Sequence, residues 1–85
     1  SPTATLDLHG YDLLAAKAEL NDWLNIAAIR HKCVLVIHGK GSGRLAEHCQ
    51  MWLADHPAVR HIDPAPPRHG GAGAKLVLLR KVQVT

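Results

Sequence analysis

Residues 34–45, VLVIHGKGSGRL, join an apolar, β-branched run to a glycine-rich turn, and a helical pattern begins directly after it. A strand that ends in such a turn and leads into a helix directs backbone N–H groups and a positive helix end toward one point. The stretch contains neither GxxxxGK[ST] nor GxGxxG, the two common nucleotide-binding fingerprints. We therefore predict a strand–turn–helix unit at the centre of the fold, with a turn that suits a phosphate.

Two helices are predicted around this unit. Asp12 is a candidate N-cap for a first helix that runs to about His31, and a second helix runs from about Arg44 to the break at Pro57. Both segments repeat apolar residues at steps of three and four, which is typical of a helix packed on a sheet. The predicted core stripes are Leu13, Ala16, Leu20, Trp23, Leu24 and Ala27 in the first helix and Leu45, Cys49, Trp52 and Leu53 in the second.

Four segments have the residue pattern of strands: 6–10, 33–37, 59–63 and 76–79, the last of which extends to Val84 at most. The prolines and glycines between 64 and 73 predict a loop that is neither helical nor paired, so the last two strands form a long-looped hairpin. Short links make the first strand–helix–strand a parallel βαβ unit. The order βαβαββ predicts an α+β fold, a two-layer sandwich of a mixed four-stranded sheet with both helices on one face.

The composition favours a small folded domain with an anionic partner. The 85 residues are 47% hydrophobic and carry a net charge of +3, with a pI near 9.2. Residues 1–5 are expected to be a lead-in and residues 6–85 a single domain, because no repeat or linker divides them. No bilayer-spanning run or signal peptide is visible, so we expect a cytoplasmic domain with no membrane partner. We also expect the isolated domain to be a monomer. Cys33 and Cys49 fall in apolar patterns and are expected to be buried free thiols.

The predicted topology gathers three glycine-rich turns at one edge of the sheet. Parallel first and second strands place His9-Gly10 and His38-Gly39 at their common carboxyl edge, where open α/β sheets often bind ligands. The last strand runs in the opposite direction, so residues 68–74 reach the same edge. We call this set of turns the glycine rim; its cations are Lys40, Arg44, Arg68 and Lys75.

Three motifs then carry a family resemblance: LDLHG (6–10), VIHGKGSGRL (36–45) and HGGAGAKLVLL (69–79). In this order and at these intervals they resemble the small MutS-related (Smr) domain, and the LDLHG form resembles the stand-alone bacterial proteins more than the domain of the MutS-type ATPases. The resemblance implies nucleic-acid binding, nicking or endonuclease activity in several members, and links to recombination control and to RNA cleavage on ribosomes. It also implies a fold similar to the C-terminal domain of translation initiation factor three.

Asp7, His9 and His38 are the candidate catalytic residues. Asp7 and His9 lie two apart on a predicted strand and share a face, so the carboxylate can fix the imidazole tautomer and favour the charged ring. His9 would then transfer a proton at a phosphodiester, and His38 would act as a second proton-transfer group or as a phosphate donor. The alternative is that Asp7 caps a turn and His9 is a surface histidine.

The candidate nucleic-acid-binding residues supply charge, close backbone approach and stacking. They are Tyr11, Gly39, Lys40, Gly41, Arg44, Arg68, Gly70, Gly71 and Gly73. Gly39 and Gly41 would admit a phosphate beside Lys40, and Tyr11 is the one aromatic side chain outside the helix stripes. The alternative is a tight turn with an incidental lysine, followed by a flexible hairpin.

The seven histidines do not predict a metal centre, because no pair sits at ligand spacing on one element. We expect no tightly bound metal or cofactor, while a weakly held Mg²⁺ or Mn²⁺ at Asp7 stays open. His31, His48, His56 and His61 are expected to be scattered surface residues.

These features predict an endonuclease or nicking domain that acts on structured RNA or DNA with low sequence specificity. The alternative is a non-catalytic module that binds nucleic acid or a ribosome through the same glycine rim; a protein-docking role for the exposed sheet face is a third. The choice between RNA and DNA, and between water and the ribose 2′-hydroxyl as the nucleophile, stays open.

Overall fold

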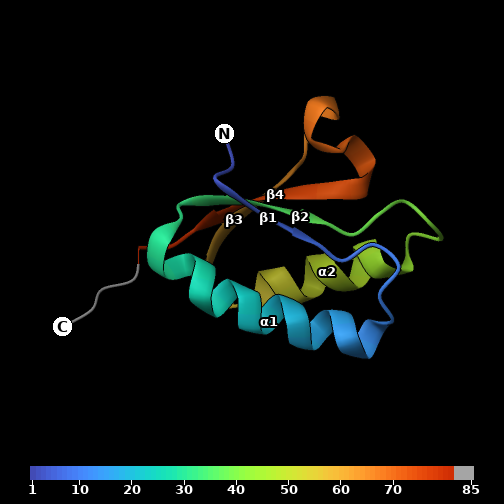
Figure 1. Ribbon diagram of the computed structural model, residues 1–85, viewed down its shortest axis with the longest axis horizontal. Helices are drawn as coiled ribbons and strands as arrows, with labels where there is room; N and C mark the ends of the chain where they lie inside the picture. Colours follow the sequence, from blue (N-terminus) through green and yellow to red (C-terminus); the bar gives the residue numbers. More distant parts are fainter. Residues whose placement is uncertain (82–85) are drawn as a thin grey trace.

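The computed structural model describes residues 1–81. Its elements are β1 (Ala4–Asp7), α1 (Leu13–Arg30), β2 (Cys33–Ile37), α2 (Arg44–Asp55), β3 (Val59–Pro64) and β4 (Ala74–Leu79). Figure 1 shows that both helices cover the same face of the sheet. The predicted α+β, two-layer architecture is therefore confirmed. The possible extension of the last strand to Val84 lies outside the described residues.

The sheet has the strand order β1-β2-β4-β3. Strand β1 pairs with β2 in parallel, with Asp7 opposite Ile37. Strand β4 lies between β2 and β3 and is antiparallel to both. The carboxyl ends of β1 and β2 and the amino end of β4 therefore lie at one edge, which is the arrangement that the glycine rim requires.

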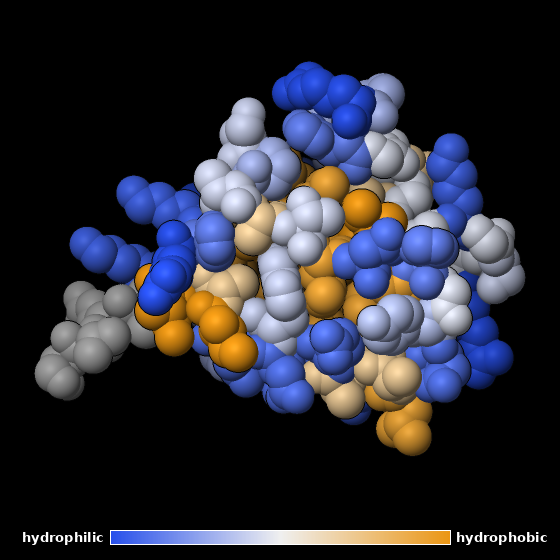
Figure 2. Space-filling model, in the orientation of Figure 1, coloured by the Kyte–Doolittle hydropathy of each residue, from blue (hydrophilic) through white to orange (hydrophobic). Residues whose placement is uncertain are grey.

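The main core lies between the sheet and the helices, where apolar stripes from both layers meet. Its largest fully buried side chains are Leu8, Leu20, Leu24, Val34, Val36, Cys49, Leu53 and Val77. Trp23 and Trp52 are partly buried and pack against this core, as their helix positions predict. A smaller cluster of Leu35, Ala65 and Ala74 lies on the other side of the sheet. Figure 2 shows hydrophobic side chains near the middle of the visible face, below the hydrophilic projection at the top.

The prediction that residues 64–73 are neither helical nor paired is wrong. Pro64 pairs with Lys75 in the ladder, and the Ala65 N–H donates to the Ala74 carbonyl oxygen. Two 3₁₀ turns follow, at Pro67–His69 and Gly71–Gly73. Proline is compatible with both settings, because an edge strand needs no inward N–H from it and its fixed φ suits the first position of a helical turn.

His56 is not the surface residue that its position outside the apolar stripes predicts, since its relative exposure is only 8%. Its Nε2–H donates to the Asn25 side-chain oxygen at 3.0 Å, and its Nδ1 accepts the Ala58 N–H at 3.0 Å. Burial lowers the pKa of His56 below its ordinary 6.5. The ring is thus held neutral, as a link between α1 and the turn that leads into β3.

Cys33 and Cys49 are both free thiols. Cys49 is fully buried, and this burial raises the pKa of its thiol to about 11, so it is chemically inert at neutral pH. Cys33 is only half-buried. Among residues 1–81, no helix combines the length and the apolar character needed to cross a membrane.

Candidate functional site

Asp7 and His9 form a close pair at the end of β1. The His9 Nδ1–H donates to Asp7 Oδ1 at 2.6 Å, and the His9 backbone N–H donates to the same oxygen at 3.0 Å. These bonds lower the pKa of Asp7 below 3.8, so the carboxylate is ionised at neutral pH. The side chains keep 48% and 72% of their surfaces exposed, respectively. Because Nδ1 is occupied, Nε2 is the nitrogen of His9 that is available to a substrate.

The pair is built by a turn and not by a continuous strand. Strand β1 ends at Asp7, whereas the alternating pattern predicts a strand as far as Gly10. Leu8 is fully buried and anchors the turn, and Gly10 has a φ of +81° that suits glycine. Asp7 therefore caps the turn and orients His9 at the same time, so the two interpretations of this carboxylate describe one arrangement.

His38 lies much deeper than His9, with a relative exposure of 4%. Its Nδ1–H donates to the Gly39 carbonyl oxygen at 2.7 Å. Burial, followed by the charge of Lys75, lowers the pKa of His38 below 6.5 although the Gly39 bond opposes this shift. The ring is therefore neutral, and within residues 1–81 its buried Nε2 has no hydrogen-bond partner.

Two backbone hydrogen bonds and two close approaches at glycine join the three turns of the glycine rim. The Gly73 carbonyl oxygen accepts the N–H groups of His38 at 3.0 Å and Gly39 at 2.9 Å. Gly39 has a φ of +79°, and a Cβ there would lie 3.2 Å from the His9 Cβ. A Cβ on Gly73 would lie 3.4 Å from Lys40 Cγ. Glycine at position 39 therefore lets the 38–43 turn approach His9 closely, whereas a side chain at position 73 would meet only an ordinary van der Waals contact.

A hollow of about 400 Å³ opens beside the pair. Its lining includes His9, Gly10, Tyr11, His38 and the 39–43 turn, together with Leu45 and Ala46 at the start of α2. The N-cap of α2 is Gly43, which offers no side-chain hydrogen bond to the first turn. The Arg44 N–H donates to Ser42 Oγ at 3.3 Å, which leaves the N–H groups of Leu45 and Ala46 without a cap among residues 1–81. Those groups suit an anion, and Lys40 adds a positive charge at the same place.

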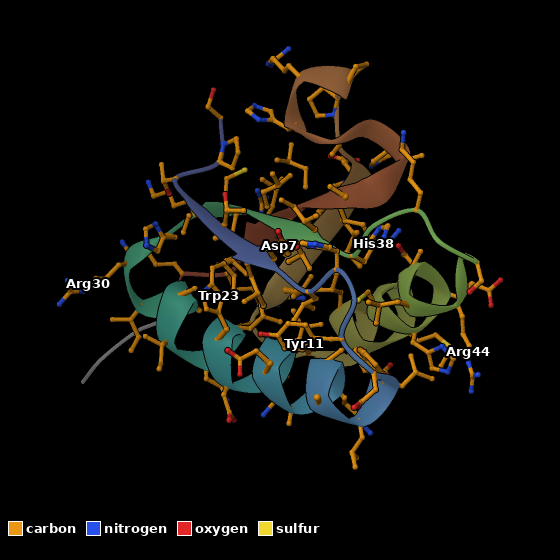
Figure 3. All side chains as sticks on the ribbon, turned by 45° about the vertical axis from the view of Figure 1, so that its right-hand side comes forward. Asp7, Tyr11, Trp23, Arg30, His38 and Arg44 are labelled. Carbon is orange, nitrogen blue, oxygen red and sulfur yellow. The ribbon has the colours of Figure 1, made fainter. Side chains whose placement is uncertain are left out.

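The candidate binding residues do not all reach this hollow. Tyr11, Gly39, Lys40 and Gly41 line it, and Gly73 supports it from below through the backbone bonds. Arg44 lines a neighbouring hollow with Tyr11 and Ser42. Arg68, Gly70 and Gly71 line neither hollow and belong to the projecting segment between β3 and β4. Figure 3 shows Asp7, Tyr11 and His38 near the centre, with Arg44 farther out on α2.

A second His–Asp pair, which is not among the predicted site residues, lies on the opposite edge strand of the sheet. The His61 Nε2–H donates to Asp63 Oδ1 at 2.9 Å on strand β3. The i, i+2 spacing that singles out Asp7 and His9 is present here as well, so the spacing alone could have found it. Among residues 1–81, no group of three or more His, Cys, Asp or Glu side chains is arranged to hold a metal ion.

Curated relatives are similar over almost the whole chain. Proteins named ribosome rescue factor SmrB match over 79 residues, with 42% identity in Shewanella sp. (strain W3-18-1) and 40% in Shewanella oneidensis. Each match covers 92% of this chain and 45% of the relative. The chain thus spans about half the length of the curated relatives it matches.

Solved structures give the same result. The Smr domain of Thermus thermophilus MutS2 superimposes with a TM-score of 0.86 and 32% identity, covering 92% of this chain and 99% of that one. YdaL, a stand-alone small MutS-related protein from Escherichia coli, gives 0.84 and 30%, covering 91% and 64%. The likeness to translation initiation factor three stays a prediction. Residues 6–80 match the Smr domain family, and the chain therefore belongs to that family.

Proposed function

We propose that this domain cleaves phosphodiester bonds in structured RNA or DNA with low sequence specificity. The observation that supports this most is the 2.6 Å bond between His9 Nδ1 and Asp7 Oδ1, beside a hollow lined by glycine-rich backbone and Lys40. An ionised carboxylate that orients an imidazole leaves the opposite nitrogen ready for proton transfer.

In the proposed reaction, His9 Nε2 accepts the proton of the attacking hydroxyl as the new P–O bond forms. The bond to the leaving oxygen then breaks, and that oxygen takes a proton from His9 or from water. Lys40 and the N–H groups at the start of α2 stabilise the negative charge that builds up on the phosphoryl oxygens. The attacking hydroxyl is a water molecule or a ribose 2′-hydroxyl.

His38 is better suited to hold the turn than to transfer a proton. Its Nδ1–H is committed to the Gly39 carbonyl, and a neutral, buried ring cannot donate from Nε2 to a phosphate. We therefore propose a positioning role for His38, which orients the Gly39–Lys40 peptide. A weakly held Mg²⁺ or Mn²⁺ at Asp7 is a separate proposal, tested by cleavage with and without a chelator.

The alternative is a module that binds a ribosome or nucleic acid through the glycine rim without cutting. Relatives named ribosome rescue factor favour the ribosome as a partner. Because the chain spans under half of those proteins, the ribosome is a proposal for this chain.

A cleavage assay on matched RNA and DNA hairpins separates these functions. Cutting of the hairpins by the protein, and its loss in Asp7→Ala and His9→Ala with binding retained, would support the nuclease. Loss of RNA cutting when a single 2′-deoxy nucleotide stands at the cut site would identify the 2′-hydroxyl as the nucleophile. Binding of both hairpins without any cutting, with and without added Mg²⁺, would leave the binding module as the function.

A further inference from the structure

Five cations gather at the edge of the sheet opposite the glycine rim. They are Arg30, Lys32, Arg60, Arg80 and Lys81, and they line one hollow of about 570 Å³. We call them the basic edge. They come from the end of α1, the α1–β2 link, β3 and the segment after β4. Figure 3 shows Arg30 and Arg44 at opposite sides of the molecule.

Backbone contacts hold these segments together. The Leu79 N–H donates to the Lys32 carbonyl oxygen and the Arg80 N–H to the Ala58 carbonyl oxygen, both at 2.8 Å. Arg60 occupies a register shift in β3, and such a bulge re-aims a side chain. The convergence of the cations is therefore a property of the fold and does not depend on flexible side chains meeting by chance.

The basic edge accounts for the whole positive charge of the domain. It holds five of the ten lysines and arginines, and the other five face seven carboxylates, so the remaining chain carries a net charge of −2. Within residues 1–81, the ion pairs are the two His–Asp pairs, and no Asp or Glu side chain of these residues pairs with a cation of the basic edge. The dipole of α1 explains Arg30 and Lys32 at its carboxyl end, but not the three cations from β3 and from beyond β4.

We propose that the basic edge is a second binding surface, which holds the phosphate backbone of a nucleic acid whose other part lies at the glycine rim. Three of its five cations are arginines, whose planar guanidinium groups match phosphate. The five residues of β2 separate the two edges by about 16 Å, which is about five base pairs of duplex. The inference rests on the proposed function only in naming a nucleic acid as the polyanion.

Direct binding tests this without relying on cleavage. Arg60→Gln, Arg80→Gln and Lys81→Gln are combined in one variant on a His9→Ala background, and the affinity for 4- and 16-base-pair RNA stems is measured by fluorescence anisotropy over a salt series. The matched control combines Lys17→Gln, Asn21→Asp and Gln50→Glu, exposed helix positions that remove the same net charge of three. Circular dichroism checks that both variants fold.

The edge variant should bind the long stem about tenfold more weakly than its parent, and its slope of log K against log salt should fall by up to about 2.7. The short stem should bind all proteins alike, and the control should lose much less on the long stem. Equal losses in the edge and control variants, or a long-stem affinity unchanged in the edge variant, would overturn the inference. If the protein cleaves RNA but the edge variant binds the long stem normally, the basic edge is refuted and the proposed nuclease function stands. If the edge variant binds weakly but the protein never cleaves, the nuclease function is refuted and the basic edge stands.

Discussion

The two His–Asp pairs have the same spacing in the sequence but different chemical surroundings. Asp7 and His9 lie at the end of β1, and His61 and Asp63 lie within β3, so the pairs occupy the two edge strands of one sheet. The first pair uses His9 Nδ1 at 2.6 Å, and the second uses His61 Nε2 at 2.9 Å. The nitrogen left free is therefore Nε2 in His9, at the tip of the ring, and Nδ1 in His61, which lies closer to the backbone.

The surroundings separate the pairs further. His9 lines a hollow with Lys40, Gly41 and the start of α2, where the N–H groups of Leu45 and Ala46 have no cap within the described residues. His61 and Asp63 lie opposite Leu78 and Leu76 in the β3–β4 ladder, and they line neither hollow at the glycine rim. A carboxylate and an imidazole two residues apart are thus a common local feature. What surrounds them decides whether they can act on a phosphodiester.

Removing the two pairs separately gives the largest expected difference. His9→Ala should slow single-turnover cleavage by about 10²–10⁴-fold, because a positioned proton-transfer group contributes that much. His61→Ala, at the pair outside the glycine rim, should stay within about twofold of the unchanged protein, as expected for a surface substitution. Equal losses of cleavage rate in the two variants would show that the Asp7–His9 pair has no special catalytic role.

Substitutions at glycine separate backbone strain from the position of His9. Gly39→Ala adds a Cβ 3.2 Å from the His9 Cβ, whereas Gly43→Ala has a similar φ of +84° and no neighbour within 4 Å. Both should lose about 1–2 kcal/mol of unfolding free energy, because alanine is strained in that region. Both residues line the hollow, but Gly39→Ala should reduce cleavage much more, by about tenfold to a hundredfold, because it displaces His9. Chemical denaturation and single-turnover rates test the two effects separately, and a matching rate loss in Gly43→Ala would contradict the role of the close contact.

The sheet, the helices and the meeting of the turns could be predicted from the sequence, because all of these follow from local periodicity and from the direction of parallel strands. The burial of His38 and His56 could not be predicted in this way. That depth depends on which neighbours cover a ring, and contacts such as the Gly73 carbonyl accepting two N–H groups of the 38–39 turn are tertiary. The 3₁₀ turns after Pro66 were missed for a different reason, because proline excludes an α-helix interior but permits a short helical turn.

His38 can be tested as a positioning residue with one variant that keeps the hydrogen-bond donor at Nδ1 and one that removes it. In His38→Asn the amide NH₂ can replace Nδ1 and donate to the Gly39 carbonyl, whereas His38→Leu removes the donor. We expect His38→Asn to retain most of the cleavage rate and His38→Leu to lose about tenfold, with the same rate-against-pH profile in both. If His38→Asn were as slow as His38→Leu while remaining folded, the catalytic alternative for His38 would be favoured. Thermal unfolding of both variants provides the folding control.

The smallest expected effect is a pH dependence of stability with two separate windows. Burial lowers the pKa of His38 and His56 below 6.5, so the unfolded chain binds more protons there. Their contribution is complete above pH 6.5 and is lost progressively as the pH falls below that value. Hydrogen bonds to His9 lower the pKa of Asp7, so its contribution is present above pH 3.8 and is lost only as the pH falls below that value.

Thermal unfolding between about pH 3 and pH 8 tests this separation. His56→Gln can still donate to Asn25 but cannot become charged. Its unfolding midpoint temperature should therefore fall by a few degrees less than that of the unchanged protein as the pH drops below 6.5. Asp7→Asn should flatten the decline only in the acidic window, because the amide does not titrate. If Asp7→Asn instead removed the fall in the unfolding midpoint below pH 6.5, the buried histidines would not be its sole cause. The exposed Asp7–His9 pair would then be coupled to the buried rings.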